Sequence, residues 1–196
     1  MNYSATKQHV ANRGIPPDDF LDQLVDWGKS AAEEIFEPNE FSDIYSSIFN
    51  TLGPWQAPPH RRAVMLEVMR VHAGFESSWN WKEGVDVSNK SSLAHVAGQE
   101  TGIFQVSFDS QGIAHGFMRP FAKAHGIDTV EKFIPAMKQN HPLALEYYAR
   151  LIRVNVAWAG PIIRHEIDPW LRRDAVSEFQ TLVLPKTRSP KRKKKS

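Results

Sequence analysis

Apolar residues recur at helical spacing along most of the chain, and most densely between residues 58 and 75. The apolar positions of this stretch are Val64, Met65, Leu66, Val68, Met69, Val71 and Phe75. A helix that is apolar on nearly all sides is a buried one. The pattern therefore predicts a central buried helix that begins at Pro58, since proline fits a first helical turn, and ends near Gly74.

Narrower apolar stripes predict further helices on both sides of the central one. These stripes cover residues 18–35, 39–52, 129–137, 142–158 and 167–184. Pro38, Gly53 and Gly160 lie where three of the expected helices end. Alternation typical of a strand is confined to residues 103–108. We therefore expect a mainly α fold with a buried central helix and at most a very small β-sheet.

The length of the chain fits one domain with short appendages. Its 196 residues suffice for a sizeable core. We expect a flexible N-terminus over residues 1–15, an N-terminal helical cap over residues 16–55 and a main domain over residues 56–184. A basic disordered tail is expected over residues 185–196.

Composition and charge exclude several classes of protein. The chain has no cysteine, so disulfides and thiol nucleophiles are excluded. No apolar run approaches the ~20 residues of a membrane span, and no signal peptide is visible. Residues 186–196 hold seven Lys and Arg; taking these from the net charge of +2 leaves the rest at −5. Nucleic acid is not the partner we expect, and the tail is read as a solubility, wall-affinity or targeting element.

Glu76 is the main candidate for chemistry. It follows the central helix at the C-terminal end, where partial burial and the helix dipole both disfavour an ionised carboxylate. A glutamic acid that stays protonated near neutral pH suits a general acid. The alternative is that Glu76 is a solvated residue at a helix end.

Two short motifs flank a long polar loop, which spans residues 82–99. The first is Glu76-Ser77-Ser78 and the second is Gly102-Ile103-Phe104-Gln105-Val106-Ser107. Together they resemble the Glu-Ser…Gly-Leu-Met-Gln signature of the lysozyme-like superfamily, above all soluble lytic transglycosylases and goose-type lysozymes. Residues 83–88 and 158–162 resemble further motifs of bacterial lysozyme-like proteins. The resemblance covers residues 62–166, roughly half the chain.

This resemblance implies a peptidoglycan glycosidase, either a muramidase or a lytic transglycosylase, such as an antibacterial effector or an endolysin. The bond cleaved would be the β-1,4 bond between N-acetylmuramic acid and N-acetylglucosamine, with Glu76 as acid and then base. The region over residues 56–184 is then a lysozyme-like catalytic domain. Ser107 stands where goose-type enzymes carry an Asp, which weakens a two-acid mechanism copied from them.

A second carboxylate is sought in the polar loop and just after it. Asp86 and Glu100 are the candidates, and their separation from Glu76 would distinguish retention from inversion. Lytic transglycosylases work with one Glu, so Asp86 and Glu100 need not be catalytic and three other roles are open to them. They would order the loop, orient a water or bind Ca²⁺ through oxygen ligands. Apart from this Ca²⁺ alternative, no metal or cofactor is expected.

Substrate-binding residues are expected around the two motifs and on the later helix. They are Ser77, Ser78, Trp79, Phe104, Gln105, Ser107, Tyr147 and Trp158. In the superfamily the matching Gln lines the sugar cleft, so this role is carried over to Gln105. Aromatic side chains stack on sugar rings, and the alternative for each one here is a place in the core or in the cleft wall.

Glycan strands of peptidoglycan are the expected partner, and an immunity or inhibitor protein is a candidate second one. Without a visible signal peptide, the protein would be made in the cytoplasm and act in the periplasm or at the cell wall. It would leave the cell by non-Sec export or by lysis. Two alternatives stay open: a glycan- or protein-binding protein without turnover, and a chitinase- or chitosanase-like hydrolase.

Overall fold

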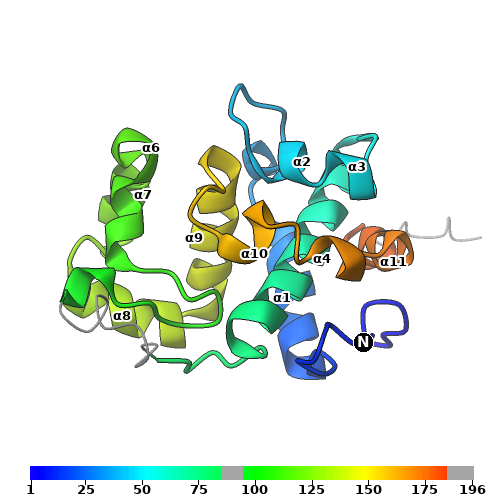
Figure 1. The fold of residues 1–196 in the computed structure, drawn as a ribbon, viewed down its shortest axis with the longest axis horizontal. Helices are drawn as coiled ribbons and strands as arrows, with labels where there is room; N and C mark the ends of the chain where they lie inside the picture. The colour runs from blue at the N-terminus through cyan, green and yellow to red at the C-terminus, as the bar shows by residue number, and fades with distance from the viewer. Residues whose placement is uncertain (85–94, 185–196) are drawn as a thin grey trace, which may run out of the picture.

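The structure is a computed structural model that describes residues 1–84 and 95–184. Asp86 and the basic tail, to which the sequence assigns roles, lie outside these residues. Within them the chain forms ten α-helices, short 3-10 turns and no extended strand (Figure 1). Two isolated β-bridges join Val10 to Gly14 and Thr101 to Val106. The prediction of a mainly α fold is confirmed.

Helix α4, Pro58–Ser77, is the central element. Fifteen of its twenty residues are buried, as its nearly continuous apolar surface predicts. It packs against α1 (Asp18–Ser30) and α11 (Arg173–Val183), and the short α10 (Gly160–Ile163) also contacts it (Figure 1). A buried helix of five turns fixes the position of the residues at its end.

Helix α9, His141–Val154, forms a second buried element beside α1 and α8. Apolar faces of these three helices continue into the core around α4. The remaining helices are short: α2 (Ile44–Ser47), α3 (Phe49–Leu52), α6 (Ile113–Gly116), α7 (Arg119–Ala124) and α8 (Val130–Gln139). In Figure 1, α6, α7 and α8 lie on the far side of α9 from α4 and α11.

Several predicted helices are shorter than their apolar stripes. The stripe over residues 39–52 forms α2 and α3 because the backbone leaves helical geometry at Ile48. Asp43 caps α2 by accepting a hydrogen bond from the Ser46 N–H at 3.2 Å, so the helix begins later than expected. The stripe over residues 142–158 ends as helix at Val154, since Asn155 is extended. Apolar spacing locates a helix but not its ends.

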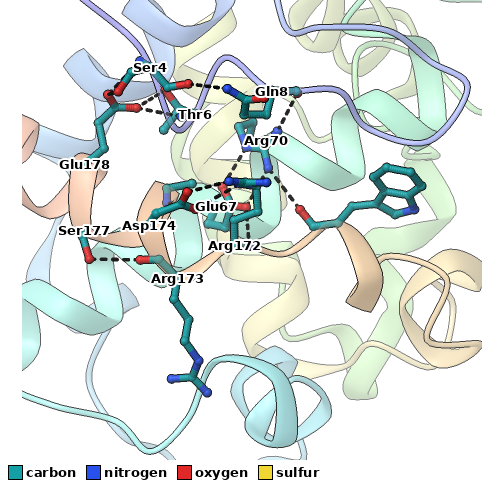
Figure 2. Close-up of polar contacts among 12 residues, drawn as sticks. Ser4, Thr6, Gln8, Glu67, Arg70, Arg172, Arg173, Asp174, Ser177 and Glu178 are labelled. Carbon is teal, nitrogen blue, oxygen red and sulfur yellow. Dashed lines mark hydrogen bonds and ion pairs between the residues drawn. The ribbon is translucent and has the colours of Figure 1, made fainter.

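The N-terminal segment packs against the body, which corrects the expectation of a flexible N-terminus. Tyr3, Thr6 and Val10 are buried. The Glu178 carboxylate accepts hydrogen bonds from the backbone N–H and the hydroxyl of both Ser4 and Thr6, at 2.7 to 2.9 Å (Figure 2). One apolar core also runs through residues 16–55 and 56–184, so the expected cap is part of the same packed body.

A fully buried ion pair lies in the middle of α4. The guanidinium of Arg70 donates two hydrogen bonds to the Glu67 carboxylate, both at 2.7 Å (Figure 2). Glu67 also accepts from the backbone N–H of Arg172 at 2.9 Å, and Arg70 donates to the Trp170 carbonyl at 3.2 Å. The pair therefore ties α4 to the segment that leads into α11.

None of the helices in the described ranges combines the length and the apolar composition that crossing a bilayer requires.

Candidate active site

Glu76 lies in the last turn of α4, which ends abruptly. Ser78 and Trp79 both adopt left-handed backbone conformations, with φ of 51° and 62°. The Trp79 indole folds back onto the helix and donates to the Arg70 carbonyl at 2.9 Å. Gly74 permits this, since a Cβ there would lie 2.7 Å from the Trp79 ring. Trp79 is buried and closes the helix, which corrects the expectation that it stacks on a sugar.

The Glu76 side chain is 22% exposed and faces a fully buried histidine one turn earlier. Its Oε1 lies 3.1 Å from His72 Nε2. The two atoms are within ion-pair distance, but they are not aligned as a hydrogen bond, and Nε2 has no aligned partner among the described residues. Glu76 is therefore partly open to solvent while one oxygen lies against an imidazole.

Tyr148 of α9 fixes the other side of that imidazole. Its hydroxyl lies 2.7 Å from His72 Nδ1, and the two rings stack at a 5.4 Å centroid distance and 16°. Burial raises the pKa of Tyr148 well above 10, and the nearby charge of Glu76 raises it further. The phenol is therefore a proton donor over the whole physiological range. Glu76, His72 and Tyr148 form a row from the surface into the core.

The second motif forms a tight turn between the bridged residues Thr101 and Val106. Gly102 has φ of +73°, and a Cβ there would lie 2.7 Å from the Met137 carbonyl oxygen. Only glycine meets both demands without strain. The Ser77 hydroxyl donates to the Ile103 carbonyl at 2.8 Å. This hydrogen bond joins the end of α4 to the turn, so the two motifs of the sequence meet in space.

Three of the expected substrate-binding residues are part of the framework. Ser77 uses its hydroxyl as donor to Ile103 and is buried. Phe104 is buried and stacks on Tyr148 at 3.8 Å and 6°. Tyr147 is fully buried, with its hydroxyl 2.5 Å from Ser110 Oγ. These positions correct the expectation of substrate contact for both aromatic residues, because Phe104 packs on Tyr148 and Tyr147 lies on the buried face of α9.

The other expected residues keep some exposed surface. Gln105 is half-buried, has φ of +46°, and donates from its amide to the Gly102 carbonyl at 2.8 Å. Ser107 is half-buried and Ser78 is exposed. Trp158 is half-buried, meets Tyr148 edge-on at 6.2 Å and donates to the Asn155 carbonyl at 2.8 Å. Trp158 thus lies beside the row formed by Glu76, His72 and Tyr148.

Glu100 is half-buried and directly precedes the bridge residue Thr101. Asp86 lies outside the described residues, so a carboxylate pair with Glu76 stays a prediction. Within residues 1–84 and 95–184, no three acidic or histidine side chains gather in a geometry that holds a metal ion.

Sequence reasoning missed His72, Tyr148 and Arg164. His72 and Glu76 are four residues apart on one helix, and this spacing indicates that their side chains are neighbours. Arg164 follows α10 and pairs with Glu166 at 2.7 Å. The hydrogen bond with Glu166 raises the pKa of Arg164, and the charges of Glu166 and Glu76 add to this effect. A persistent cation therefore lies within electrostatic reach of Glu76.

Comparisons of the chain with protein-family models, with curated proteins and with solved structures found no match. The resemblance to lysozyme-like proteins therefore depends on the motif residues of the sequence alone.

Proposed function

We propose that the protein cleaves the β-1,4 bond between N-acetylmuramic acid and N-acetylglucosamine in peptidoglycan, with Glu76 as the general acid. The observation that carries the proposal is the placement of Glu76. It is a partly exposed carboxyl at the end of a buried helix, 3.1 Å from His72, and beside the turn that carries Gln105. Each part of this arrangement has a use in glycoside cleavage.

A general acid must be held at a fixed distance from the oxygen that it protonates. Helix α4 supplies this rigidity, because nearly all of its surface is packed. The exposed part of Glu76 is the part that a glycan would meet. In the first step, the carboxyl proton passes to the leaving glycosidic oxygen as the bond to the anomeric carbon breaks. The resulting carboxylate then serves as the base.

His72 and Tyr148 have the role of positioning residues in this proposal. The Tyr148 phenol keeps its proton, so its O–H can donate to His72 Nδ1. That hydrogen bond selects the tautomer with the imidazole proton on Nε2, the nitrogen that faces Glu76. The positive end of the Nε2–H dipole then lies near the Glu76 Oε1, which is 3.1 Å from Nε2 without hydrogen-bond alignment, and attracts that oxygen electrostatically. It also stabilises the carboxylate once the proton has left.

Muramidases and lytic transglycosylases begin with the same proton transfer. They differ in the second step. A hydrolase adds water at the anomeric carbon, whereas a transglycosylase closes a 1,6-anhydro ring with the substrate's own hydroxyl. The single carboxyl described at the end of α4 suffices for the latter route. Asp86 and Glu100 remain the proposed candidates for a second acid.

A glycan-binding protein without turnover is the second candidate. The observation in its favour is that Gln105 and Trp158 keep exposed surface, and contact with a glycan through them needs no proton transfer. Trp158 and Gln105 would still contact a bound glycan.

Loss of turbidity of purified peptidoglycan sacculi separates the two candidates. The wild-type protein is compared with Glu76→Gln, which keeps the shape of the side chain and removes its acid. Glu131→Gln, an exposed change at the start of α8, is the matched control. Clearing by wild type and control but not by Glu76→Gln supports the proposal. No clearing by wild type contradicts it, and chitin and chitosan then test the related polymers.

A further inference from the structure

A separate cavity of about 760 Å³ lies between α1, the end of α8 and the start of α9. This volume is in the range of small-molecule sites, about 300 to 1,000 Å³. His141 lies on its wall at the start of α9, whereas Tyr148 beside Glu76 is seven residues further along that helix. At ~1.5 Å per residue the two are about 10 Å apart along the axis. The cavity is therefore distinct from the candidate active site.

Side-chain amides supply much of the polar lining. Gln23 of α1 and Gln139 and Asn140 at the end of α8 all line the cavity. An amide offers both donors and an acceptor, and a sugar hydroxyl likewise donates and accepts. Three amides in one cavity therefore match a ligand rich in hydroxyl groups.

The walls of the cavity are held in place by contacts behind them. His141 stacks on the Trp81 ring at a 3.9 Å centroid distance and 7°, and its Nδ1 contacts the side-chain amide oxygen Oε1 of Gln23. Asn140 caps α9 by accepting from the Leu143 N–H at 3.3 Å. A preformed wall lowers the entropy cost of binding.

Trp27 reaches the same cavity with only a small part of its side chain. It is 5% exposed, and its indole N–H is buried without a hydrogen-bond partner among the described residues. A buried donor without a partner costs free energy that a water or a ligand would recover.

The lining is close to electrically neutral. No lysine or arginine is among the described residues that line the cavity. Asp26 is paired with Lys29 at 2.8 Å. Burial lowers the pKa of His141 below its ordinary value, which keeps the imidazole uncharged at pH 7. Phosphorylated and carboxylated ligands therefore find no cation here.

We propose that this cavity binds a short neutral oligosaccharide, as a site separate from Glu76. The size of the cavity, its three side-chain amides and its lack of a lining cation all point to this class of ligand. The proposal does not depend on Glu76 acting as an acid. If the protein is a glycosidase, the site would hold a neighbouring stretch of glycan during turnover.

The test is an NMR titration of the full chain carrying Glu76→Gln, so that the saccharide is not consumed. The probe is tri-N-acetylchitotriose, and the signals are the indole N–H resonances of the six tryptophans. Trp27→Phe assigns one signal. The Trp27 and Trp81 resonances are expected to shift and to saturate. Inorganic phosphate at equal concentration is expected to leave both unchanged.

Two glutamine variants locate the binding. Gln139→Ala changes an exposed residue of the cavity and is expected to weaken binding about fivefold, the loss of one hydrogen bond. Gln180→Ala on α11 is the matched control and is expected to leave the affinity unchanged. The proposal is overturned if the Trp27 signal does not shift, or if only the Trp79 and Trp158 signals shift. It is also overturned if phosphate shifts Trp27 equally, or if both glutamine variants behave like the parent.

Discussion

The Ser77 hydroxyl donates to the carbonyl of Ile103 at 2.8 Å, across 26 residues of sequence. It also contacts the Ala73 carbonyl at 3.2 Å within its own helix. Through this one side chain, the end of the buried helix α4 holds the turn that carries Gln105. The relationship explains why a serine follows Glu76: it fixes the partner turn and does not need to touch substrate.

Ser77→Ala is expected to lower the free energy of unfolding by about 1 to 2 kcal/mol, because the buried Ile103 carbonyl loses its partner. Ser177→Ala is the matched control, since Ser177 donates to the Arg173 carbonyl one turn earlier on an exposed helix surface. It is expected to change stability by less than about 0.5 kcal/mol. Urea unfolding measures both. Equal effects would show that the contact with Ile103 contributes nothing.

His72 is expected to be needed for the orientation of Glu76. His72→Asn keeps a polar group near the Tyr148 hydroxyl but removes the one that faces Glu76, whereas His72→Gln extends an amide toward Glu76. We expect His72→Asn to lower kcat/KM about tenfold more than His72→Gln, equal to about 1.4 kcal/mol of transition-state stabilisation. Thermal unfolding of both variants controls for stability. If the two lose activity equally, the contact between His72 and Glu76 has no part in the reaction.

Alkaline pH is expected to destabilise the protein through its tyrosines. Burial is the largest cause that raises the pKa of all four tyrosines, Tyr3, Tyr45, Tyr147 and Tyr148. In the unfolded chain each phenol ionises near pH ~10. Above that pH the folded state binds more protons than the unfolded state, so stability is complete below about pH 10 and falls as pH rises.

The expected slope is about −1.4 kcal/mol per pH unit for each phenol that ionises only on unfolding. Absorbance at the tyrosinate band, followed together with circular dichroism, measures this coupling. Tyrosinate is expected to appear only as the helices unfold. Ionisation of the phenols near pH 10 in a protein that is still folded would contradict the burial of these side chains.

The buried pair of Glu67 and Arg70 is expected to be costly to break. Glu67→Ala leaves a guanidinium without its carboxylate in the core, and we expect a loss of about 3 to 5 kcal/mol. Asp128→Ala, which removes the exposed partner of Lys132, is expected to cost at most about 1 kcal/mol. Chemical denaturation distinguishes the two. A mild effect of Glu67→Ala would mean that water or another group satisfies Arg70.

The sequence predicted the central helix well because a helix buried on all sides has apolar residues on all sides. Val64, Met65 and Leu66 are successive residues that point to different sides of the helix, and each is fully buried. Helix ends were less predictable, because they depend on single backbone conformations. The left-handed geometry of Ser78 and Trp79 has no counterpart in apolar spacing.

Of the candidate site, sequence reasoning identified Glu76 and the turn that meets it, but not the row behind them. Tyr147 and Tyr148 are neighbours in sequence, and only the packing of α9 decides which hydroxyl meets His72. From the sequence, Trp79 and Phe104 could stack on a sugar ring or belong to the core. In the structure Trp79 donates to the Arg70 carbonyl and Phe104 stacks on Tyr148, so both belong to the core. The choice between core and cleft is made by tertiary packing, which residue type does not encode.

Mass spectrometry of peptidoglycan digests tests the central claim most directly. Purified sacculi are incubated with wild-type protein, with Glu76→Gln and with the exposed control Glu131→Gln. The masses of the released muropeptides are then measured. We predict new glycan ends from wild type and from the control, either reducing or 1,6-anhydro, and none above background from Glu76→Gln. Intact glycan strands after incubation with wild type, or the same ends from Glu76→Gln, would contradict the account.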